Sequence, residues 1–290
     1  MNKLNALRIK VTAPSAHFKI GHSSNPRRTY PLPPYSTVIG LLANVAGRRD
    51  LIGRMLSEPF DLGIICNYSY FSLEYIWLRN MQVKAHLQRF SLLPNRYIQE
   101  QVEHPGGQSP VTFEVLNEVE IFVYFYHPDQ EVLGFLMDNL DKPERWLTHL
   151  HLGRAEDWAT VEEKSMFELQ VSNSGRDFRN AALYYQWLPV TDFATGTETI
   201  LNKQEYQEFY DKIQGNAMLV TSIYSLIKTP LQSQEEKMIR NFRHIPARLC
   251  KSQIPFLDSL KLPYLLVDRD KETPVYMCHI DPQKGAVNYA

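Results

Sequence analysis

Apolar and charged positions alternate near the start of the chain, over residues 7–11, where Arg8 and Lys10 separate apolar neighbours. A period of two predicts a strand with one buried face and one positively charged face. A polar loop and the prolines of residues 31–34 follow. Proline fixes its own φ and pushes the preceding residue out of the helical region, so we expect the first helix to begin after Pro34.

Beyond the prolines the hydrophobic pattern changes to helical spacing. Apolar side chains recur as on one face of a helix, and Gly47 stands where such a helix would end. We predict a short amphipathic helix over residues 37–46, capped at its start by Ser36 or Thr37.

Two segments rich in Ile, Tyr and Phe, residues 62–78 and 115–126, predict strands, the first being either one long strand or two joined ones. They bracket residues 79–110, which end in the turn signal PGGQSP. We predict that this insertion forms an extended hairpin or loop arm, with a disordered surface loop as the alternative. Its basic residues are the candidate contacts to a polyanion: Arg79, Lys84, Arg89 and Arg96.

Residues 130–140 have helical spacing, and residues 167–171 alternate as a further strand. The resulting order, βαββαβ, predicts an α+β fold with a ferredoxin-like (RRM-like) domain over residues 1–175. Residues 176–290 form a mixed α/β C-terminal region to which the pattern assigns no topology. Its expected elements are helices at 203–214 and 234–242 and strands at 218–227, 262–267 and 275–280.

Composition narrows the class of protein. With 44% hydrophobic residues, the chain of 290 residues can fill a core without staples. Cys66, Cys250 and Cys278 are odd in number and far apart, which argues against a disulfide framework and a cysteine zinc site. A charged N-terminus and the lack of a long apolar run predict a cytoplasmic protein without a membrane partner. We expect no cofactor.

Charge is distributed unevenly along the sequence. The first 49 residues contain no Asp or Glu but eight Lys and Arg, whereas residues 50–290 hold 23 basic and 32 acidic residues. Because electrostatic attraction is screened within about 10 Å, this concentration predicts a localised contact with a polyanion. Nucleic acid is the first partner to consider.

The basic segment contains the three side-chain types that single-stranded RNA requires: cations for phosphates, aromatic rings for bases and small polar groups for hydroxyls. Ser36 and Thr37 also lie at a predicted helix start, where free backbone N–H groups bind anions. The alternatives are a solvated loop for the two arginines and core packing for at least one of Phe18 and Tyr30. The candidates are Lys19, Arg27 and Arg28 for phosphates, His17, Phe18 and Tyr30 for bases, and Ser36 and Thr37.

Histidine spacing suggests one further site. His149 and His151 would lie on the same side of a strand, but two ligands without a third are more often structural than metal-binding. We therefore expect no metal site. The sequence also lacks the motifs of P-loop nucleotide hydrolases, serine hydrolases and zinc proteases.

Two motifs carry a resemblance to a known family. The first comprises Ala16-His17-Phe18-Lys19 and the run PLPPYSTVIGLL at residues 31–42, and the second is LGRAED at residues 152–157. Both elements, in this order, resemble the CRISPR-associated Cas family five, a RAMP-superfamily subunit of type I Cascade complexes, most similar to its subtype I-B branch. The resemblance covers about residues 4–171. Many relatives have a glycine-rich loop late in the chain, whereas the last hundred residues here contain only three glycines.

The resemblance implies a function in antiviral defence or RNA-guided DNA targeting. Members of this family bind the 5′ handle of the CRISPR RNA (crRNA), cap the ribonucleoprotein complex, and contact the backbone and large subunits. The complex as a whole reaches target DNA. The resemblance also implies that the arm at 79–110 acts as a thumb across the guide, and it adds Arg154 as a candidate RNA contact.

The rival interpretation is a metal-independent endoribonuclease that cuts CRISPR repeat RNA, as one branch of the family does. Such chemistry needs side chains that activate a 2′-hydroxyl and stabilise the leaving group. The candidates are His17, His22, Tyr30, Lys84 and His86. Because the chain lacks the adjacent Lys and His pair of that branch, we predict a subunit without catalytic residues.

Overall fold

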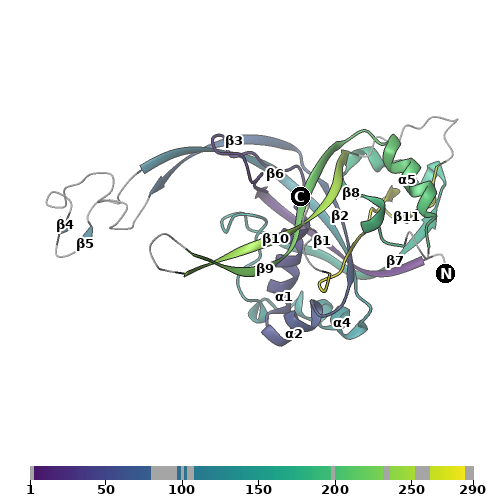
Figure 1. Ribbon diagram of the computed structural model, residues 1–290, viewed down its shortest axis with the longest axis horizontal. Helices are drawn as coiled ribbons and strands as arrows, with labels where there is room; N and C mark the ends of the chain where they lie inside the picture. Colours follow the sequence, from purple (N-terminus) through teal and green to yellow (C-terminus); the bar gives the residue numbers. More distant parts are fainter. Residues whose placement is uncertain are drawn as a thin grey trace.

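The computed structural model describes residues 3–79, 97–98, 101–102, 108–196, 200–230, 236–251 and 262–284. Its central element is one eleven-stranded sheet in which every pair of neighbouring strands is antiparallel. A few helices accompany the sheet (Figure 1). The α+β class predicted from the sequence is confirmed.

Strand β1 (Lys3–Ala16) is a central strand and confirms the first predicted element, extended at both ends. Its apolar side chains at Leu7, Ile9 and Val11 are fully buried. The strand pairs with β6 (Gln108–Tyr126) on one side and with β7 (Thr160–Ser172) on the other. Alternation therefore identified a real strand and its buried face.

Helix α1 (Tyr35–Ala46) confirms the predicted helix. Gly47 ends it in the left-handed conformation at φ 71°, where a Cβ would lie 1.8 Å from the carbonyl oxygen of Arg145. The predicted cap is wrong, because Pro34 occupies the N-cap position and makes no side-chain cap. Helix α2 (Arg49–Met55), which the sequence analysis did not predict, and α4 (Gln130–Asn139), which it did, lie beside α1 in Figure 1.

The predicted strand at 62–78 is two strands, β2 (Phe60–Asn67) and β3 (Tyr70–Arg79). Strand β6 is long enough to pair with β1 and β2 in the body and with β3 beyond it. Strands β3 and β6 leave the body together as an arm (Figure 1). Two short paired strands, β4 (Tyr97–Ile98) and β5 (Gln101–Val102), lie between them in the sequence.

Helix α5 (Lys203–Lys212) belongs to the C-terminal region and confirms the prediction at 203–214. Short 3-10 turns connect elements after α4, among them η1 (Pro143–Arg145), η2 (Gly175–Phe178), η3 (Ala181–Leu183) and η4 (Thr191–Phe193). The remaining strands are β8 (Tyr185–Pro189), β9 (Asn216–Pro230), β10 (Glu236–Lys251), β11 (Leu265–Asp268), β12 (Thr273–Pro274) and β13 (Cys278–Ile280). No helix within the described ranges is long and apolar enough to cross a membrane.

The predicted helix at 234–242 is wrong where the structure describes it. Residues 236–242 belong to β10 and pair with β9. Antiparallel pairing with β9 supplies hydrogen bonds to the backbone of this segment. This pairing outweighs the helical spacing of its apolar residues. The strand predicted at 218–227 is confirmed as β9. The strand predicted at 275–280 is confirmed only over β13, since the buried residues Val275, Tyr276 and Met277 lie between β12 and β13 and belong to neither strand.

The sheet order is β12-β11-β7-β1-β6-β2-β8-β10-β9, with β13 also paired to β2 and β3 paired to β6. Strands from residues 176–290 therefore flank those from residues 1–175 on both sides. The division of the chain into two domains stays a prediction.

Candidate nucleic-acid interface

Residues 17–30 form a loop that is hydrogen-bonded to the base of the arm, and we call it the docked loop. Its two sides are joined by the N–H of Tyr30, which donates to the carbonyl of Phe18 at 2.8 Å. The N–H of Arg27 donates to the carbonyl of Thr112 at 2.7 Å, and the N–H of Glu114 donates to the carbonyl of Arg27 at 2.9 Å. The loop thus occupies the edge of β6 opposite β3.

The docked loop presents three cations at the surface. Lys19 is exposed, and the structure records no ion pair for Lys19 or Arg27 within the part of the chain it describes. The Arg28 side chain is 66% exposed, and its Nε lies 3.9 Å from a carboxylate oxygen of Glu114. The guanidinium of Arg27 lies 5.0 Å from the ring centroid of Phe113. Lys19 and Arg28 are therefore exposed cations, and Arg27 is a half-buried one.

The cations of β1, in contrast, form ion pairs with carboxylates of the protein. Arg8 contacts carboxylate oxygens of Asp268 and Asp270, each at 3.0 Å. Lys10 contacts Glu162 at 2.7 Å and Glu120 at 3.1 Å, and these hydrogen bonds raise the pKa of Lys10. The positive face expected for this strand is therefore neutralised inside the molecule.

His17 and Phe18 are buried, with 4% and 1% of their surfaces exposed. The Nδ1 of His17 lies 2.7 Å from the carbonyl oxygen of Glu114, and its ring meets Phe113 edge-on at 5.2 Å. Burial lowers the pKa of His17, and the nearby guanidinium of Arg154 lowers it further. The expectation that these two rings stack on bases is corrected, because the core already covers both.

Tyr30 is partly buried, and its ring meets that of Trp187 edge-on, with centroids 5.5 Å apart. Burial raises the pKa of Tyr30. The alternative of core packing for at least one of Phe18 and Tyr30 is thus confirmed by Phe18.

The expected anion site at the start of α1 is also corrected. The hydroxyl oxygens of Ser36 and Thr221 are 2.7 Å apart, so Ser36 already has a hydrogen-bond partner. The N–H of Thr37 donates to the carbonyl of Pro34 at 3.0 Å. The anion site is therefore corrected for the N–H of Thr37, while RNA contact of the Ser36 and Thr37 hydroxyls stays a prediction.

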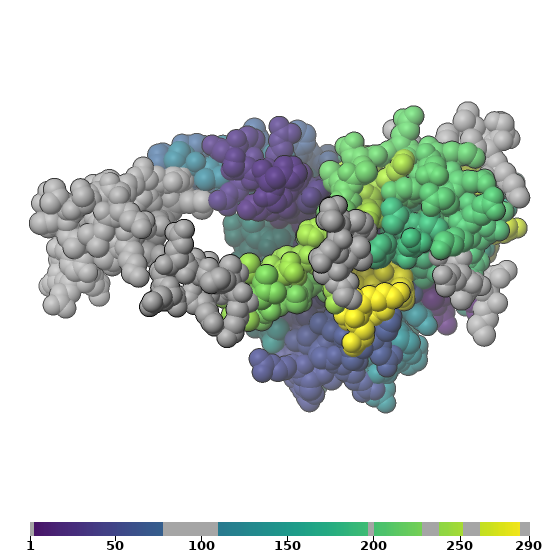
Figure 2. Space-filling view, in the orientation of Figure 1, coloured from purple at the N-terminus to yellow at the C-terminus, as the bar shows by residue number. Residues whose placement is uncertain are grey.

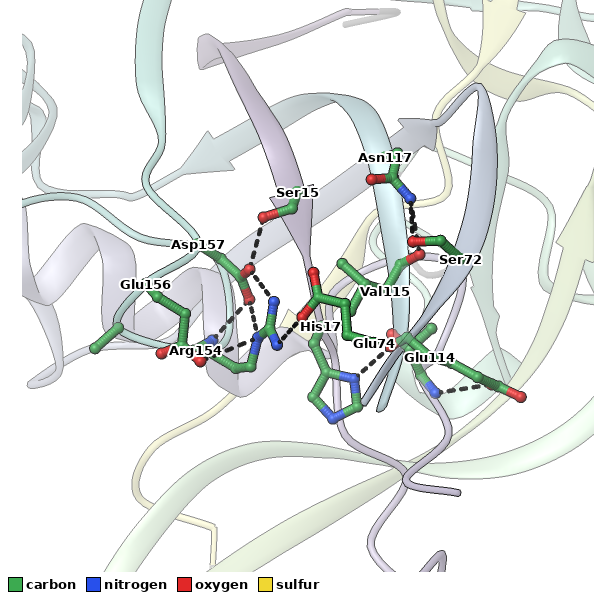
Figure 3. Close-up of polar contacts among 12 residues, drawn as sticks. Ser15, His17, Ser72, Glu74, Glu114, Val115, Asn117, Arg154, Glu156 and Asp157 are labelled. Atoms are coloured by element: carbon green, nitrogen blue, oxygen red, sulfur yellow. Dashed lines mark hydrogen bonds and ion pairs between the residues drawn. The ribbon is translucent and has the colours of Figure 1, made fainter. Parts of the chain in front are cut away.

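Arg154 belongs to an internal network rather than to the surface (Figure 3). Its Nη2 lies 2.7 Å from Oδ1 of Asp157, and its Nη1 lies 2.8 Å from Oε2 of Glu74 on β3. Asp157 is fully buried and also accepts a hydrogen bond from the hydroxyl of Ser15 at 2.8 Å. Arg154 is only 12% exposed. The expected RNA contact of Arg154 is therefore corrected. The side chain instead links β1 and β3 to the segment at residues 152–157.

Gly153 explains the start of this motif. Its φ is 93°, and a Cβ at this position would lie 2.0 Å from the carbonyl oxygen of His17. Glycine is needed here because the left-handed region and the close approach of another backbone both exclude a side chain. The second motif of the sequence analysis thus fixes the docked loop against the body.

The structure reveals an aromatic surface that the sequence analysis missed. Phe71, Tyr75 and Trp77 on β3 are between 52% and 63% exposed, and we call them the arm aromatic face. The rings of Tyr75 and Trp77 meet edge-on with centroids 5.9 Å apart. The signal was present in the sequence, because large apolar residues occupy every second position of β3.

Several predicted contacts cannot be placed. Arg79 ends β3 opposite Gln108. Lys84, His86, Arg89 and Arg96 lie outside the described residues. Their assignment to RNA contact or to chemistry stays a prediction.

The next candidates for chemistry are the histidine pair and the three cysteines. The rings of His149 and His151 are 5.7 Å apart, and Nε2 of His149 lies 2.8 Å from the carbonyl oxygen of Ala155. Within the described ranges, no three or more His, Cys, Asp and Glu side chains are arranged to hold a metal ion. The three cysteines are buried thiols, and burial raises the pKa of Cys250 to about 12.

A comparison with known protein families gives a match over one part of the chain. Residues 6–58 match a family model described as CRISPR-associated protein (Cas_Cas5). This stretch contains most of β1, the docked loop, α1 and α2. No curated protein matches the sequence.

Solved structures with similar chain traces have low sequence identity. A chain of a CRISPR RNA-guided surveillance complex is 11% identical, with a TM-score of 0.45, and the match covers 84% of this chain and 89% of that one. A chain of a type III-B Cmr-beta complex bound to cognate target RNA and AMPPnP is 11% identical, with a TM-score of 0.42 and coverages of 91% and 86%. A CRISPR protein from Archaeoglobus fulgidus is 12% identical, with a TM-score of 0.34 and coverages of 96% and 92%.

Proposed function

We propose that the chain is a Cas5-type RAMP subunit of a type I CRISPR surveillance complex, most similar to subtype I-B, that binds the 5′ handle of the crRNA. The observation that carries the proposal is the docked loop, which holds Lys19, Arg27 and Arg28 at the surface at the base of the arm. The family match over residues 6–58 includes this loop and supports the proposal.

The arm aromatic face supplies the second requirement of a single-stranded ligand. Unpaired bases stack on exposed aromatic rings, and each stacked base contributes roughly 1–3 kcal/mol of binding free energy. In this arrangement the docked loop binds the phosphates at the base of the arm, and the arm acts as a thumb that takes the bases. The backbone subunit, the large subunit and, through the assembled complex, target DNA are the further partners of the proposal.

The strand order supports a ferredoxin-like N-terminal domain as part of this proposal. The elements β1, α1, β2, β6, α4 and β7 follow the order βαββαβ, and their strands lie side by side as β7-β1-β6-β2. Antiparallel sheets of this kind, with helices on one face, leave the other face or an edge to a ligand.

The proposed subunit binds RNA without cutting it. Two of the candidates for acid-base chemistry, His17 and Tyr30, pack against other rings at the base of the arm. A general base must reach the proton that it removes, and burial hinders this for His17. Incubating the full chain with repeat RNA in EDTA should leave the RNA intact, and a discrete cut that disappears on His17→Ala or His86→Ala would favour the endoribonuclease instead.

The binding step is tested by fluorescence anisotropy with single-stranded RNA of CRISPR-repeat sequence. The triple variant Lys19→Ala, Arg27→Ala, Arg28→Ala should weaken binding at least about tenfold, since each charge-assisted contact contributes about 1.5–3 kcal/mol. The matched control is Arg48→Ala, Arg49→Ala, which removes two exposed cations of the same acid-free segment at α2.

Equal losses in the loop variant and the control would show that general charge, not the docked loop, governs binding. The absence of any array near the gene would count against the assignment to a CRISPR system.

A further inference from the structure

A cavity of about 350 Å³ lies between β9, β10, β13 and the turn η4, away from the docked loop and the arm aromatic face. In Figure 2 the yellow C-terminal residues lie against the green residues of this region. One part of its lining is apolar and comprises Phe193, Ile223, Ile245 and Ile280. The other part carries Arg243, His244, His279 and Lys284. The lining therefore combines four apolar side chains, which we call the apolar wall, with four basic ones, which we call the cationic wall, and it also includes two carboxylates.

A β-bulge shapes the cavity. Two residues of β9, Ser222 and Ile223, stand opposite the single residue Arg243 of β10, because the register between the strands shifts there. The hydroxyl of Ser222 donates to the carbonyl of Arg243 at 3.2 Å and holds the irregular backbone. Bulges bend a strand and redirect its side chains, and all three of these residues line the cavity.

Arg243 is fixed in place while its charge stays uncompensated. Its Nη1 donates to the carbonyl of Asp281 at 2.9 Å, and its Nη2 donates to the carbonyl of Pro282 at 2.7 Å. These acceptors are neutral, and the structure records no ion pair for Arg243 among the residues it describes. Two of the five N–H donors of the guanidinium are used, so three remain for an anion.

His279 is oriented by a carboxylate. Its Nδ1 lies 2.7 Å from Oδ1 of Asp61, and this hydrogen bond raises the pKa of His279. Its side chain is 44% exposed, so the other ring nitrogen is accessible.

Two carboxylates also line the cavity, and both have partners. Asp192 lies 3.2 Å from Nζ of Lys203, and Oδ1 of Asp281 accepts a hydrogen bond from the N–H of Gln283 at 2.9 Å. The cavity thus holds the carboxylates of Asp192 and Asp281 together with the basic side chains of Arg243, His244 and Lys284, for which no ion pair is recorded among the described residues.

We propose that this cavity binds a nucleoside phosphate, with the base on the apolar wall of Phe193 and the isoleucines and the phosphate at Arg243, His244, His279 and Lys284. A flat heterocycle suits an aromatic and aliphatic wall, and a phosphate suits a fixed guanidinium. The volume lies within the range of about 300–1,000 Å³ typical of small-molecule sites. The proposal does not depend on the proposed function, because no residue of the docked loop takes part.

The test is isothermal titration calorimetry of the full chain with adenosine 5′-monophosphate (AMP), adenosine and inorganic phosphate as separate probes. AMP should bind at one site, and adenosine and phosphate should each bind at least about tenfold more weakly, because each engages only one wall. The double variant His244→Ala, Lys284→Ala should weaken AMP at least about tenfold. Arg240→Ala, on the same strand but outside the lining, is the control and should leave AMP binding unchanged.

The double variant removes two exposed side chains, so it tests the cavity without disturbing the anchored Arg243. Failure of AMP to bind saturably, or equal AMP affinity in the double variant and the parent chain, would overturn the proposal. A 5′-phosphorylated single-stranded RNA that displaces AMP would identify a nucleotide of an RNA strand as the source of the ligand. RNA that binds without displacing AMP would identify a free nucleotide.

Discussion

Strand β1 and the docked loop follow one another in the same acid-free segment, yet their cations are in opposite states. Arg8 and Lys10 are 13% and 18% exposed and contact carboxylates of neighbouring segments. Arg28 is 66% exposed, and Lys19 is exposed as well. The difference shows that a lack of acids in the sequence does not create a positive surface where the fold supplies acids from elsewhere.

The physical cause of the difference is the sheet itself. A central strand has a neighbour on each side, and here β6 and β7 provide Glu120 and Glu162 to Lys10. The docked loop is attached to β6 by backbone hydrogen bonds, which leaves the side chains of Lys19 and Arg28 exposed while His17 and Phe18 are buried. Function is therefore expected in the loop and stability in the strand.

The largest expected effect concerns the network that holds the loop. Asp157→Ala leaves Arg154 without its main partner in a nearly buried position, so the free energy of unfolding should fall by about 3–5 kcal/mol, as measured by urea denaturation. Glu156→Ala is the control, because Glu156 is 63% exposed and 3.5 Å from Arg154, and it should cost less than about 1 kcal/mol. Similar losses in the two variants would contradict the structural role of this network.

Breaking the paired state of β1 comes next. Arg8→Ala leaves Asp268, which is fully buried, with a hydrogen bond from Tyr124 but no cation, so stability should fall by about 3 kcal/mol. RNA affinity of the folded variant should match that of the parent chain. Reduced RNA affinity at full stability would indicate that Arg8 contacts a phosphate. It would contradict the contrast between the paired cations of β1 and the exposed cations of the docked loop.

A smaller effect is expected at the arm aromatic face. Trp77→Ala should weaken binding of single-stranded RNA by about 1–3 kcal/mol, because one stacked base loses its platform. Trp158→Ala is the matched control, since Trp158 is 68% exposed but does not lie on the arm. If both variants bind alike, the arm face does not stack bases.

The smallest effect concerns pH. Burial lowers the pKa of His17 below its ordinary value of 6.5, so the folded chain resists a proton that the unfolded chain accepts. This contribution to stability is present above pH 6.5 and is lost as the pH falls through the folded pKa. Urea denaturation between pH 7.5 and 5 should show a fall that His17→Gln reduces, and an unchanged fall in the variant would contradict a neutral, buried His17.

The sequence predicted elements whose signals are local. The prolines before α1 and Gly47 after it act through their own backbone angles, so this helix could be placed to within two residues. Residues 236–242 could not be assigned correctly, because their pairing with β9 depends on the return of the chain rather than on their own pattern. The pairing of β7 with β11 could not be predicted either, because the two strands are far apart in the sequence.

The candidate site was predicted in part for the same reason. The exposure of Lys19 and Arg28 follows from their place in a polar loop, whereas the position of Arg27 against Phe113 depends on a residue far away in the sequence. Phe18 could not be distinguished from a stacking residue, since an aromatic ring in a basic loop suits a base and a core equally well. The prediction for Arg154 was wrong because its partner Asp157, although three residues away, could equally have been a solvated acid, and its second partner Glu74 lies 80 residues away in the sequence.

The most direct test of the account is the salt dependence of RNA binding. We expect the logarithm of the affinity to fall linearly with the logarithm of salt concentration, with a slope of about 0.7 for each phosphate neutralised on a single strand. Removing Lys19, Arg27 and Arg28 together should reduce this slope by about 2, whereas removing Arg48 and Arg49 should leave it unchanged. A slope that is the same with and without the three loop cations would contradict the claim that the docked loop holds the RNA.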